Sequence, residues 1–295
     1  MTTTLAMVAT QFLDRAELSP NTVHSYEMTL LPFLRRYGRL PIEMVTEEAV
    51  EAYLASLTHL AENTHNRHRA TIRALFNFAV EQGYLEIRAI AYLKSRRSHK
   101  TVDQDKNIEQ IRYLTSEQLN LLYHLVEPNS RLHTLILLLH QTGANISEIL
   151  SLDLDQINFG DRCFEVMNQY HQSRWCFYGE NLAQVLDHYV QYYRHSGHPA
   201  LLTAQQPKSK IISHLHYRTA YRDWVNLISQ NAELKDCRLQ DIRHTFAMER
   251  VGFMAVHDLQ TLMGHDSAQT TLRYYNLSQK SIQNVAQEAL KKLKK

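Results

Sequence analysis

The residues best suited to chemistry lie in three short segments in the C-terminal half of the 295-residue chain, at 142–148, 240–246 and 264–274. They contain a tyrosine, Tyr274, an arginine, Arg243, and a histidine, His265. A tyrosine hydroxyl can act as a covalent nucleophile, which divides one difficult reaction into two easier ones. A guanidinium group suits a phosphate, because its planar fork donates two parallel charged hydrogen bonds. The three residue types together indicate chemistry at a phosphate group.

In order and spacing, these segments resemble the active-site motifs of the tyrosine recombinase (phage integrase) family, which cuts and rejoins DNA through a phosphotyrosine. The most specific part of the resemblance is Ile242-Arg243-His244-Thr245-Phe246-Ala247, then Leu262-Met263-Gly264-His265, Thr270-Thr271 and Tyr274. The resemblance implies that Tyr274 is the nucleophile, that Arg243 clamps the phosphate, and that His265 donates to a phosphate oxygen. It implies no metal and no cofactor, because side chains supply the charge.

Each of these roles has an ordinary alternative. Tyr274 is one of 16 tyrosines and could pack near a helix end, or the adjacent Tyr275 could be the reactive residue. The register relative to Gly264 favours Tyr274. Arg243 could hold a helix-capping salt bridge, although its neighbours favour the phosphate. We assign His244 a structural role, because this position of the family motif usually supports the fold.

Three positions depart from the family pattern. The family expects Arg at 145, Lys near 169, and His or Lys at 240, whereas this chain has Asn145, Gln169 and Gln240. Asn145 brings no charge, but it suits a helix N-cap with Glu148 at the third helical position. An amide cannot protonate a leaving alkoxide, so Gln169 removes the expected general acid. Gln240 replaces a further proton donor with a neutral hydrogen-bonding group.

These departures leave two hypotheses about activity. Loss of the first arginine costs about 10³–10⁵ in rate by comparison with other phosphoryl-transfer arginines, and loss of the general acid about 10²–10⁴. Arg174 and His171 on the same hairpin, or Arg238, are candidates to compensate. One hypothesis is an active recombinase with an atypical catalytic set. The other, which we favour, is a DNA-binding protein with impaired or lost cleavage, acting as a regulator or as the partner of an active recombinase.

The elements that must position these residues are mainly helical. A capping box at 115–118 begins a domain, and an apolar helix at 132–140 ends at Gly143. Short runs rich in β-branched and aromatic residues between 154 and 178 predict a small antiparallel sheet. Helices are then predicted at 180–194, 215–229, 241–254 and 258–263.

The first hundred residues predict a separate helical unit. Ser19-Pro20 begins a helix that ends at Gly38, another helix follows Thr46, and a further one spans about 64–82. The resemblance implies that this unit is a helical core-binding (SAM-like) domain that closes around DNA together with the catalytic domain. The predicted fold class is therefore mainly α with a small antiparallel β-sheet. We divide the chain into a core-binding domain at 1–93, a basic linker at 94–111, a catalytic-type domain at 112–280, and a C-terminal helix at 281–295. For this lysine-rich helix we favour docking onto a neighbouring protomer, as its family counterpart does, because its apolar face is continuous. A solvated end and a phosphate contact are the alternatives.

Two groups of basic residues are candidates for DNA binding. Those on the polar side of the 64–82 helix could enter a groove, and those of the linker could follow phosphates. A solvated charged surface is the ordinary alternative for both groups. The residues are Arg67, Arg69 and Arg73 on the helix, and Lys94, Arg96, Arg97 and Lys100 in the linker.

Composition limits the class of protein and its cellular compartment, but it does not by itself indicate DNA binding. The formal net charge is only +2, which is weak for a protein that wraps DNA, although a local patch suffices. The three cysteines have no disulfide or zinc spacing, and no apolar run approaches the roughly 20 residues of a membrane span. We expect a cytoplasmic protein with double-stranded DNA as partner, no membrane association, and self-association or assembly with another recombinase on DNA.

Overall fold

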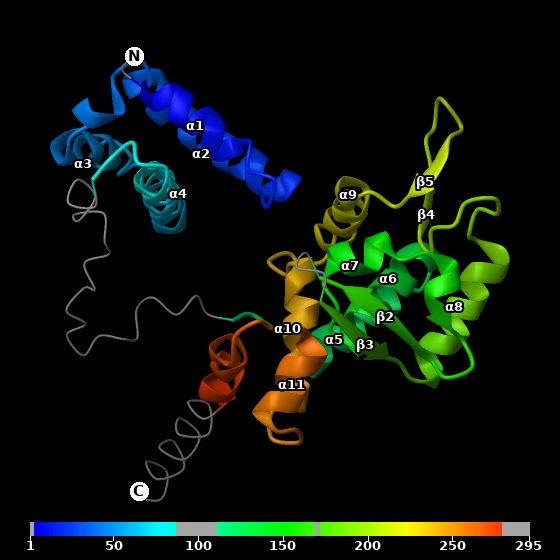
Figure 1. The fold of residues 1–295 in the computed structure, drawn as a ribbon. Helices are drawn as coiled ribbons and strands as arrows, with labels where there is room; N and C mark the ends of the chain where they lie inside the picture. Colours follow the sequence, from blue (N-terminus) through cyan, green and yellow to red (C-terminus); the bar gives the residue numbers. More distant parts are fainter. Residues whose placement is uncertain (1–2, 87–110, 169–171, 279–295) are drawn as a thin grey trace, which may run out of the picture. The chain divides into compact units, whose positions relative to one another are not determined.

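The computed structural model describes residues 3–86, 111–168 and 172–278 (Figure 1). The chain divides into two compact units, Met1–Asn107 and Ile108–Lys295, and each is described by itself. The predicted C-terminal helix at 281–295 and all but the last residue of the predicted linker lie outside the described residues. No helix in the described part is long and apolar enough to cross a membrane.

The N-terminal unit is helical, as predicted. Ser19 accepts a hydrogen bond from the backbone N–H of Thr22, and Pro20 occupies the first helical position, so the second helix begins where the sequence indicates. Thr46 caps the third helix in the same way through the N–H of Ala49. The elements are α1 (Leu5–Leu13), α2 (Pro20–Tyr37), the 3₁₀ helix η1 (Ile42–Met44), α3 (Glu47–Ala55) and α4 (Glu62–Glu81).

Helix α4 has two different sides. Its apolar side packs into the core. There, Nδ1 of the buried His68 and the Tyr53 hydroxyl form a hydrogen bond of 3.1 Å. The three arginines that the sequence assigns to DNA binding, Arg67, Arg69 and Arg73, are all exposed. Arg69 forms a long ion pair of 3.9 Å with Glu51 on α3. The arginines are therefore on the solvent side of the helix, and His68 belongs to the core.

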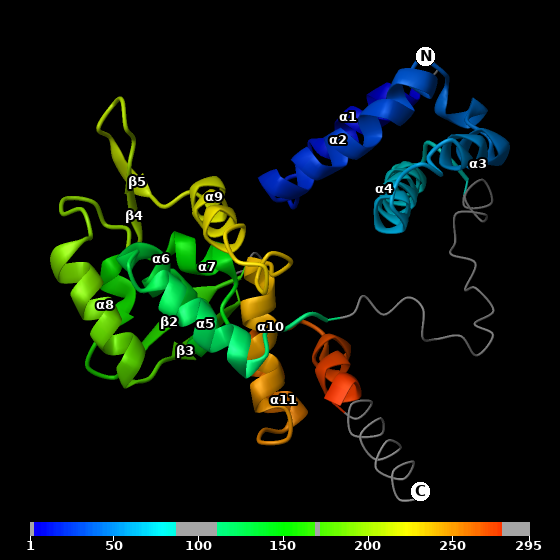
Figure 2. The ribbon, with the colours of Figure 1, turned by 180° about the vertical axis from the view of Figure 1, so that it is seen from behind.

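The second unit is built around one buried helix, α6. Residues 135–139 of α6 are at most 1% exposed, and α6 contacts α5, α7, α8, α9, α10 and β3, as Figures 1 and 2 show from opposite sides. The elements of this unit are α5 (Ser116–Val126), α6 (Ser130–Thr142), α7 (Ile146–Ser151), η3 (Leu154–Gln156), β1 (Ile157–Asn158), β2 (Cys163–Met167), β3 (Ser173–Phe177), α8 (Glu180–Tyr192), β4 (Thr203–Gln205), β5 (Ile212–His214), α9 (Tyr217–Ile228), α10 (Leu239–Arg250) and α11 (Val256–Met263), followed by a helical segment at 268–278.

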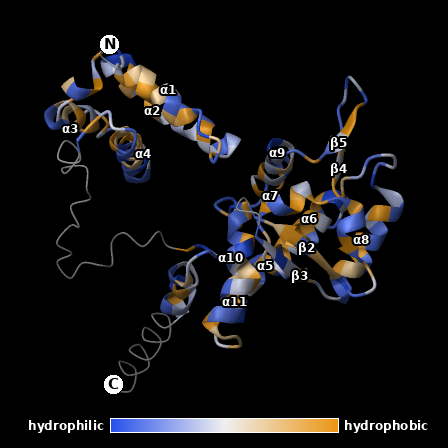
Figure 3. Ribbon diagram, viewed as in Figure 1, coloured by the Kyte–Doolittle hydropathy of each residue, from blue (hydrophilic) through white to orange (hydrophobic). Residues whose placement is uncertain are grey.

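The small antiparallel sheet predicted between 154 and 178 is present, in the order β1-β2-β3. Phe164 of β2 pairs with Cys176 of β3, and Val166 pairs with Arg174, so these four residues share the buried face. The interior of the unit, including much of β2, carries hydrophobic colours in Figure 3. The single buried charge on this face, Arg174, reaches the site described below.

Two features of this unit differ from the predictions. The hairpin β4–β5 was not predicted, because its three-residue strands, Thr-Ala-Gln and Ile-Ser-His, are too short and polar to show alternation. Helix α10 ends at Arg250 instead of 254, since the chain turns at Gly252 with φ of +93°. The other predicted helices agree with α8, α9 and α11 to within a few residues.

Two glycines end helices next to the site. Gly143 ends α6 with φ of +63°, and a Cβ there would lie 2.5 Å from the ring of Phe246 on α10. Gly264 ends α11 with φ of +63°, and a Cβ there would lie 2.8 Å from Nη1 of Arg174. Both positions need a left-handed backbone and close approach at once, which glycine alone provides without strain.

Candidate active site

Tyr274 is buried between two histidines. Its side chain is only 2% exposed, its hydroxyl oxygen lies 2.8 Å from Nδ1 of His244, and its ring stacks on that of His265 at 7° between planes and 6.2 Å between centroids. The neighbouring Tyr275 points elsewhere and donates to the carbonyl oxygen of Met254 over 2.6 Å. Tyr274, and not Tyr275, therefore faces the histidines.

A cavity of about 290 Å³ lies beside the Tyr274 hydroxyl. It brings together the three residues that the sequence assigns to catalysis, Tyr274, Arg243 and His265, and one of the three substituted positions, Gln240. The full lining consists of Ile111, Arg238, Gln240, Arg243, His244, His265, Thr270, Arg273 and Tyr274. Three guanidinium groups and no acidic side chain are present among these lining residues.

Of the other two substituted positions, the structure describes only Asn145. Asn145 is the N-cap of α7, as the spacing to Glu148 predicts, and its backbone N–H donates to Oε2 of Glu148 over 2.7 Å. Asn145 lines a neighbouring hollow that it shares with Glu148 and Gly264, not the cavity beside Tyr274. Gln169 and His171 lie outside the described residues.

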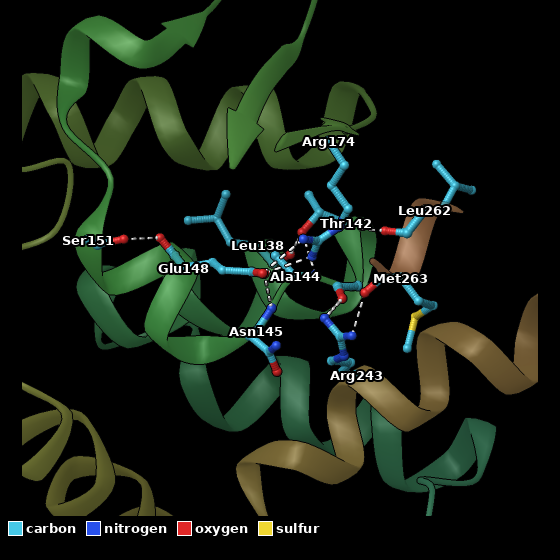
Figure 4. A network of polar contacts seen from close by, with 11 residues as sticks. Leu138, Thr142, Ala144, Asn145, Glu148, Ser151, Arg174, Arg243, Leu262 and Met263 are labelled. Atoms are coloured by element: carbon cyan, nitrogen blue, oxygen red, sulfur yellow. Dashed lines mark hydrogen bonds and ion pairs between the residues drawn. The ribbon is translucent and has the colours of Figure 1, made fainter. Parts of the chain in front are cut away.

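Arg243 is almost fully buried, with 4% exposure. Its Nη1 donates to the carbonyl oxygen of Gly143 over 2.6 Å and its Nη2 to that of Met263 over 2.5 Å, so it joins the C-terminal ends of α6 and α11 (Figure 4). Burial, and then the nearby Arg174, lower the pKa of Arg243 to about 10. The guanidinium still carries its charge at neutral pH.

Arg174 and Glu148 form a buried ion pair next to Arg243 (Figure 4). Arg174 donates from Nη1 to Oε1 over 2.8 Å and from Nη2 to Oε2 over 2.7 Å, while its Nε donates to the carbonyl oxygen of Leu262 over 2.9 Å. Each side chain is 7% exposed. Burial acts to lower the pKa of Arg174, but the hydrogen bonds and charge of Glu148 raise it above its ordinary value. All three guanidinium nitrogens donate hydrogen bonds, so Arg174 joins β3, α7 and α11.

Both histidines beside Tyr274 are neutral at pH 7. Burial and the surrounding arginines lower the pKa of His244 to about 4, and the same causes lower that of His265 to about 4. Burial raises the pKa of Tyr274, against the opposing effect of Arg243 and Arg273. The phenol is therefore protonated, and its O–H can donate to the neutral imidazole of His244.

This geometry adds to the structural role that we assigned to His244 from its place in the motif. A structural role agrees with its partial burial, but its contact with Tyr274 also places it in the candidate site. The contact joins residues 30 positions apart, so no local pattern indicates it. The ring of His265 is oriented by a 2.8 Å hydrogen bond between its Nδ1 and the hydroxyl of Thr271, which is fully buried.

Arg238 and Arg273 line the cavity although the sequence did not assign them to it, apart from Arg238 as a possible substitute donor. Arg238 is the N-cap of α10, and Asp241 accepts from its backbone N–H over 2.8 Å and from its Nε over 3.2 Å. Arg273 directly precedes Tyr274 and is exposed. A basic residue adjacent to the nucleophile is the signal that could have indicated Arg273. Within the described residues, no group of three or more His, Cys, Asp or Glu side chains is placed to hold a metal ion.

Comparison with known proteins covers both units. Residues 112–281 match the phage integrase family, and residues 10–83 match the phage integrase N-terminal SAM-like domain. The chain is 25% identical over 289 residues to tyrosine recombinase XerC of Staphylococcus epidermidis, spanning 94% of this chain and 93% of that protein. It is 27% identical over 277 residues to XerC of Oceanobacillus iheyensis, spanning 88% and 87%.

Solved structures share the fold. The Tn1549 transposon integrase in complex with a circular intermediate DNA has a TM-score of 0.74 at 18% identity, over 92% of this chain and 95% of that one. XerH site-specific recombinase bound to a palindromic difH substrate has a TM-score of 0.73 at 15% identity, over 96% and 95%. Together with the sequence matches, these likenesses confirm the mainly helical fold class with its SAM-like N-terminal domain. The chain belongs to the phage integrase (tyrosine recombinase) family.

Proposed function

We propose that this protein is a cytoplasmic, double-stranded DNA-binding member of a site-specific recombination or integration system, in which strand cleavage through Tyr274 is impaired or lost. The domains at 1–93 and 112–280 each contact the duplex, and the C-terminal helix at 281–295 contacts a neighbouring protomer or an active recombinase. The names of the XerC relatives and the DNA complexes of similar fold support DNA as the partner.

The observation that carries the proposal is the chemical content of the cavity beside Tyr274. The cavity retains a buried nucleophile and a buried guanidinium, but Gln240 is an uncharged amide and both histidines have pKa values of about 4. A general acid works best when its pKa is close to the operating pH. The described lining therefore provides no group suited to protonate a leaving sugar oxygen.

The expected loss of rate is large. The smaller penalties for a missing clamp arginine and a missing general acid, about 10³ and 10², together exceed 6 kcal/mol of barrier at about 1.4 kcal/mol per decade. Losses of groups that act as a unit are not additive, so the combined loss differs from this sum. It is large enough to turn a recombinase into a DNA-binding protein on a physiological timescale.

One observation favours the second candidate function, an active recombinase with an atypical catalytic set. The Tyr274 hydroxyl lies 2.8 Å from Nδ1 of His244, and a neutral imidazole at that distance can take the phenolic proton as the oxygen attacks phosphorus. This contact supplies a base for the first step. It supplies no acid for the leaving group, which is why we favour impaired cleavage.

A nicked suicide duplex distinguishes the two functions. The bound site is first selected from fragmented genomic DNA, and the duplex carrying it is incubated with the protein and resolved on native and denaturing gels. A shifted band on the native gel with no covalent adduct supports the proposal. An adduct that Tyr274→Phe abolishes and Tyr275→Phe retains supports the active recombinase. No binding to any duplex contradicts both.

A further inference from the structure

The cavity beside Tyr274 contains more positive charge than the family residues alone provide. Arg238, Arg243 and Arg273 all line it, and none of its described lining residues is acidic. Resting on the proposed function, we propose that Arg238 and Arg273 bind one DNA backbone phosphate in this cavity. They thereby supply the charge that Asn145 and Gln240 lack, so that the former active site grips a phosphodiester without cleaving it.

Arg243 is poorly placed to carry this role alone. Both of its terminal nitrogens already donate to the carbonyl oxygens of Gly143 and Met263, and 4% of the residue is exposed. Each terminal nitrogen has one further N–H, but the bidentate fork that suits a phosphate is directed at the backbone. A phosphate in the cavity needs additional donors at its exposed side.

Arg238 is positioned for that role by Asp241. The carboxylate accepts from the backbone N–H and the Nε of Arg238, and is itself only 2% exposed. The terminal nitrogens of Arg238 make no hydrogen bond to a described residue, and its side chain is 60% exposed. Arg238 also sits at the N-terminus of the 12-residue helix α10, whose dipole favours an anion at the same place.

Arg273, one residue before Tyr274, contributes a further guanidinium group to the lining. It is exposed and lines the same cavity. Its charge contributes to lowering the pKa values of His244 and His265, and it opposes the burial that raises the pKa of Tyr274. Thr270 also lines the cavity.

The ligand class follows from the donors. Arginines beside neutral histidines form a site for an oxyanion, and a phosphodiester is the oxyanion that a DNA-binding member of this family meets in quantity. Free inorganic phosphate shares this chemistry. The two sources are separated in the experiment.

The first measurement is the salt dependence of binding by the full-length protein to a duplex of genomic DNA. A protein that neutralises Z phosphates loses affinity with a slope of about −0.9Z in log K against log salt. The variants are Arg238→Gln, Arg273→Gln and their combination. Arg162→Gln, which removes an exposed arginine on a turn outside the cavity, is the matched control. We expect the double variant to reduce the magnitude of the slope by about 0.9, because both arginines bind the same phosphate. This change in slope should be larger than the change that Arg162→Gln causes.

Lysine variants separate binding from folding. Arg238→Lys and Arg273→Lys keep the charge, so we expect them to retain the slope that the glutamine variants lose, whereas a folding defect would affect binding without regard to the retained charge. If the unaltered protein binds the duplex and the double glutamine variant binds with the same slope, the inference is overturned and the proposed function stands. If the unaltered protein binds no duplex, the proposed function itself fails, and the inference fails with it.

The second measurement uses inorganic phosphate as the probe. Sodium phosphate is added at constant ionic strength while the imidazole NMR signals of His244 and His265 are followed. We expect both signals to shift, because a bound anion offsets the arginines that lower their pKa values, and we expect no shift in the double glutamine variant. Shifts that persist in that variant overturn the inference. Shifts that require both arginines, combined with an unchanged duplex slope, assign the cavity to free phosphate and overturn its assignment to DNA.

Discussion

The hydroxyl of Tyr274 lies 2.8 Å from Nδ1 of His244, and the two residues come from different helical segments of the second unit. Tyr274 is 2% exposed, so this hydrogen bond satisfies a phenol that has little access to water. The contact gives His244 a measurable contribution to folding whether or not the protein cleaves DNA.

Removal of His244 should therefore destabilise the second unit. His244→Ala leaves the buried phenol without its acceptor, which costs about 1–3 kcal/mol. Adding Tyr274→Phe to that variant removes the unsatisfied hydroxyl and should recover part of the loss, which a double-mutant cycle quantifies. Urea unfolding followed by tryptophan fluorescence measures the change, because both tryptophans of the chain, Trp175 and Trp224, lie in this unit. Strictly additive effects of the two substitutions would contradict the coupling.

Restoring the family residues should restore cleavage. Replacing Asn145 by arginine, Gln169 by lysine and Gln240 by histidine returns the charge and the proton donors, so we expect adduct formation on the suicide duplex to rise by at least about 10³. The helix start at 145 loses the side-chain cap of Asn145, at a cost of about 1 kcal/mol, but keeps the bond from its backbone N–H to Glu148. The same triple variant carrying Tyr274→Phe is the control and should form no adduct. An adduct yield equal to that of the unaltered protein would show that these positions do not limit cleavage.

The buried pair of Glu148 and Arg174 should matter more to stability than an exposed pair. Glu148→Gln leaves a guanidinium that is 7% exposed without its carboxylate, and breaking a buried pair in this way costs about 3–5 kcal/mol. The matched control is Glu180→Gln, whose partner Arg162 and own side chain are 43% and 59% exposed, and which should cost about 0–1 kcal/mol. Urea midpoints from tryptophan fluorescence compare them. Similar losses in the two variants would mean that the buried pair contributes little.

The free energy of unfolding should fall on acidification through the pH range in which His244 and His265 are neutral in the folded state and protonated in the unfolded state. Their pKa values are about 4 when folded and about 6.5 when unfolded. The unfolded chain therefore binds more protons between these values, so the contribution is complete above about pH 6.5 and is lost as the pH falls towards 4. Urea midpoints across this range measure the slope, and His244→Gln with His265→Gln should flatten it. An unchanged slope in the double variant would assign the pH dependence to other groups.

Local signals predicted most of the fold. Capping residues such as Ser19 and Thr115 set helix starts, and the β-branched runs between 154 and 178 indicated the sheet. The hairpin β4–β5 was missed because its strands are three residues long and polar. Short strands depend on tertiary neighbours, which a local pattern does not contain.

For the candidate site, too, the sequence predicted some features and not others. Motif spacing placed Tyr274, Arg243 and His265 together, and the structure brings them to one cavity. The bond from Tyr274 to His244 and the pair of Glu148 and Arg174 connect residues 30 and 26 positions apart, and no periodicity marks such contacts. The lysine-rich end of the chain and Gln169 fall outside the described residues, so the assignments made there remain predictions.

The bonds from Arg243 to the carbonyl oxygens of Gly143 and Met263 have a consequence for how members of this family are classified. A cation at the C-terminal ends of two helices offsets their dipoles and satisfies carbonyl groups that no N–H of either helix reaches. A chain that no longer cuts DNA would still unfold more easily without it. The presence of this arginine in a related sequence therefore indicates only that the fold is intact. Whether such a protein cleaves DNA has to be judged from the other catalytic positions.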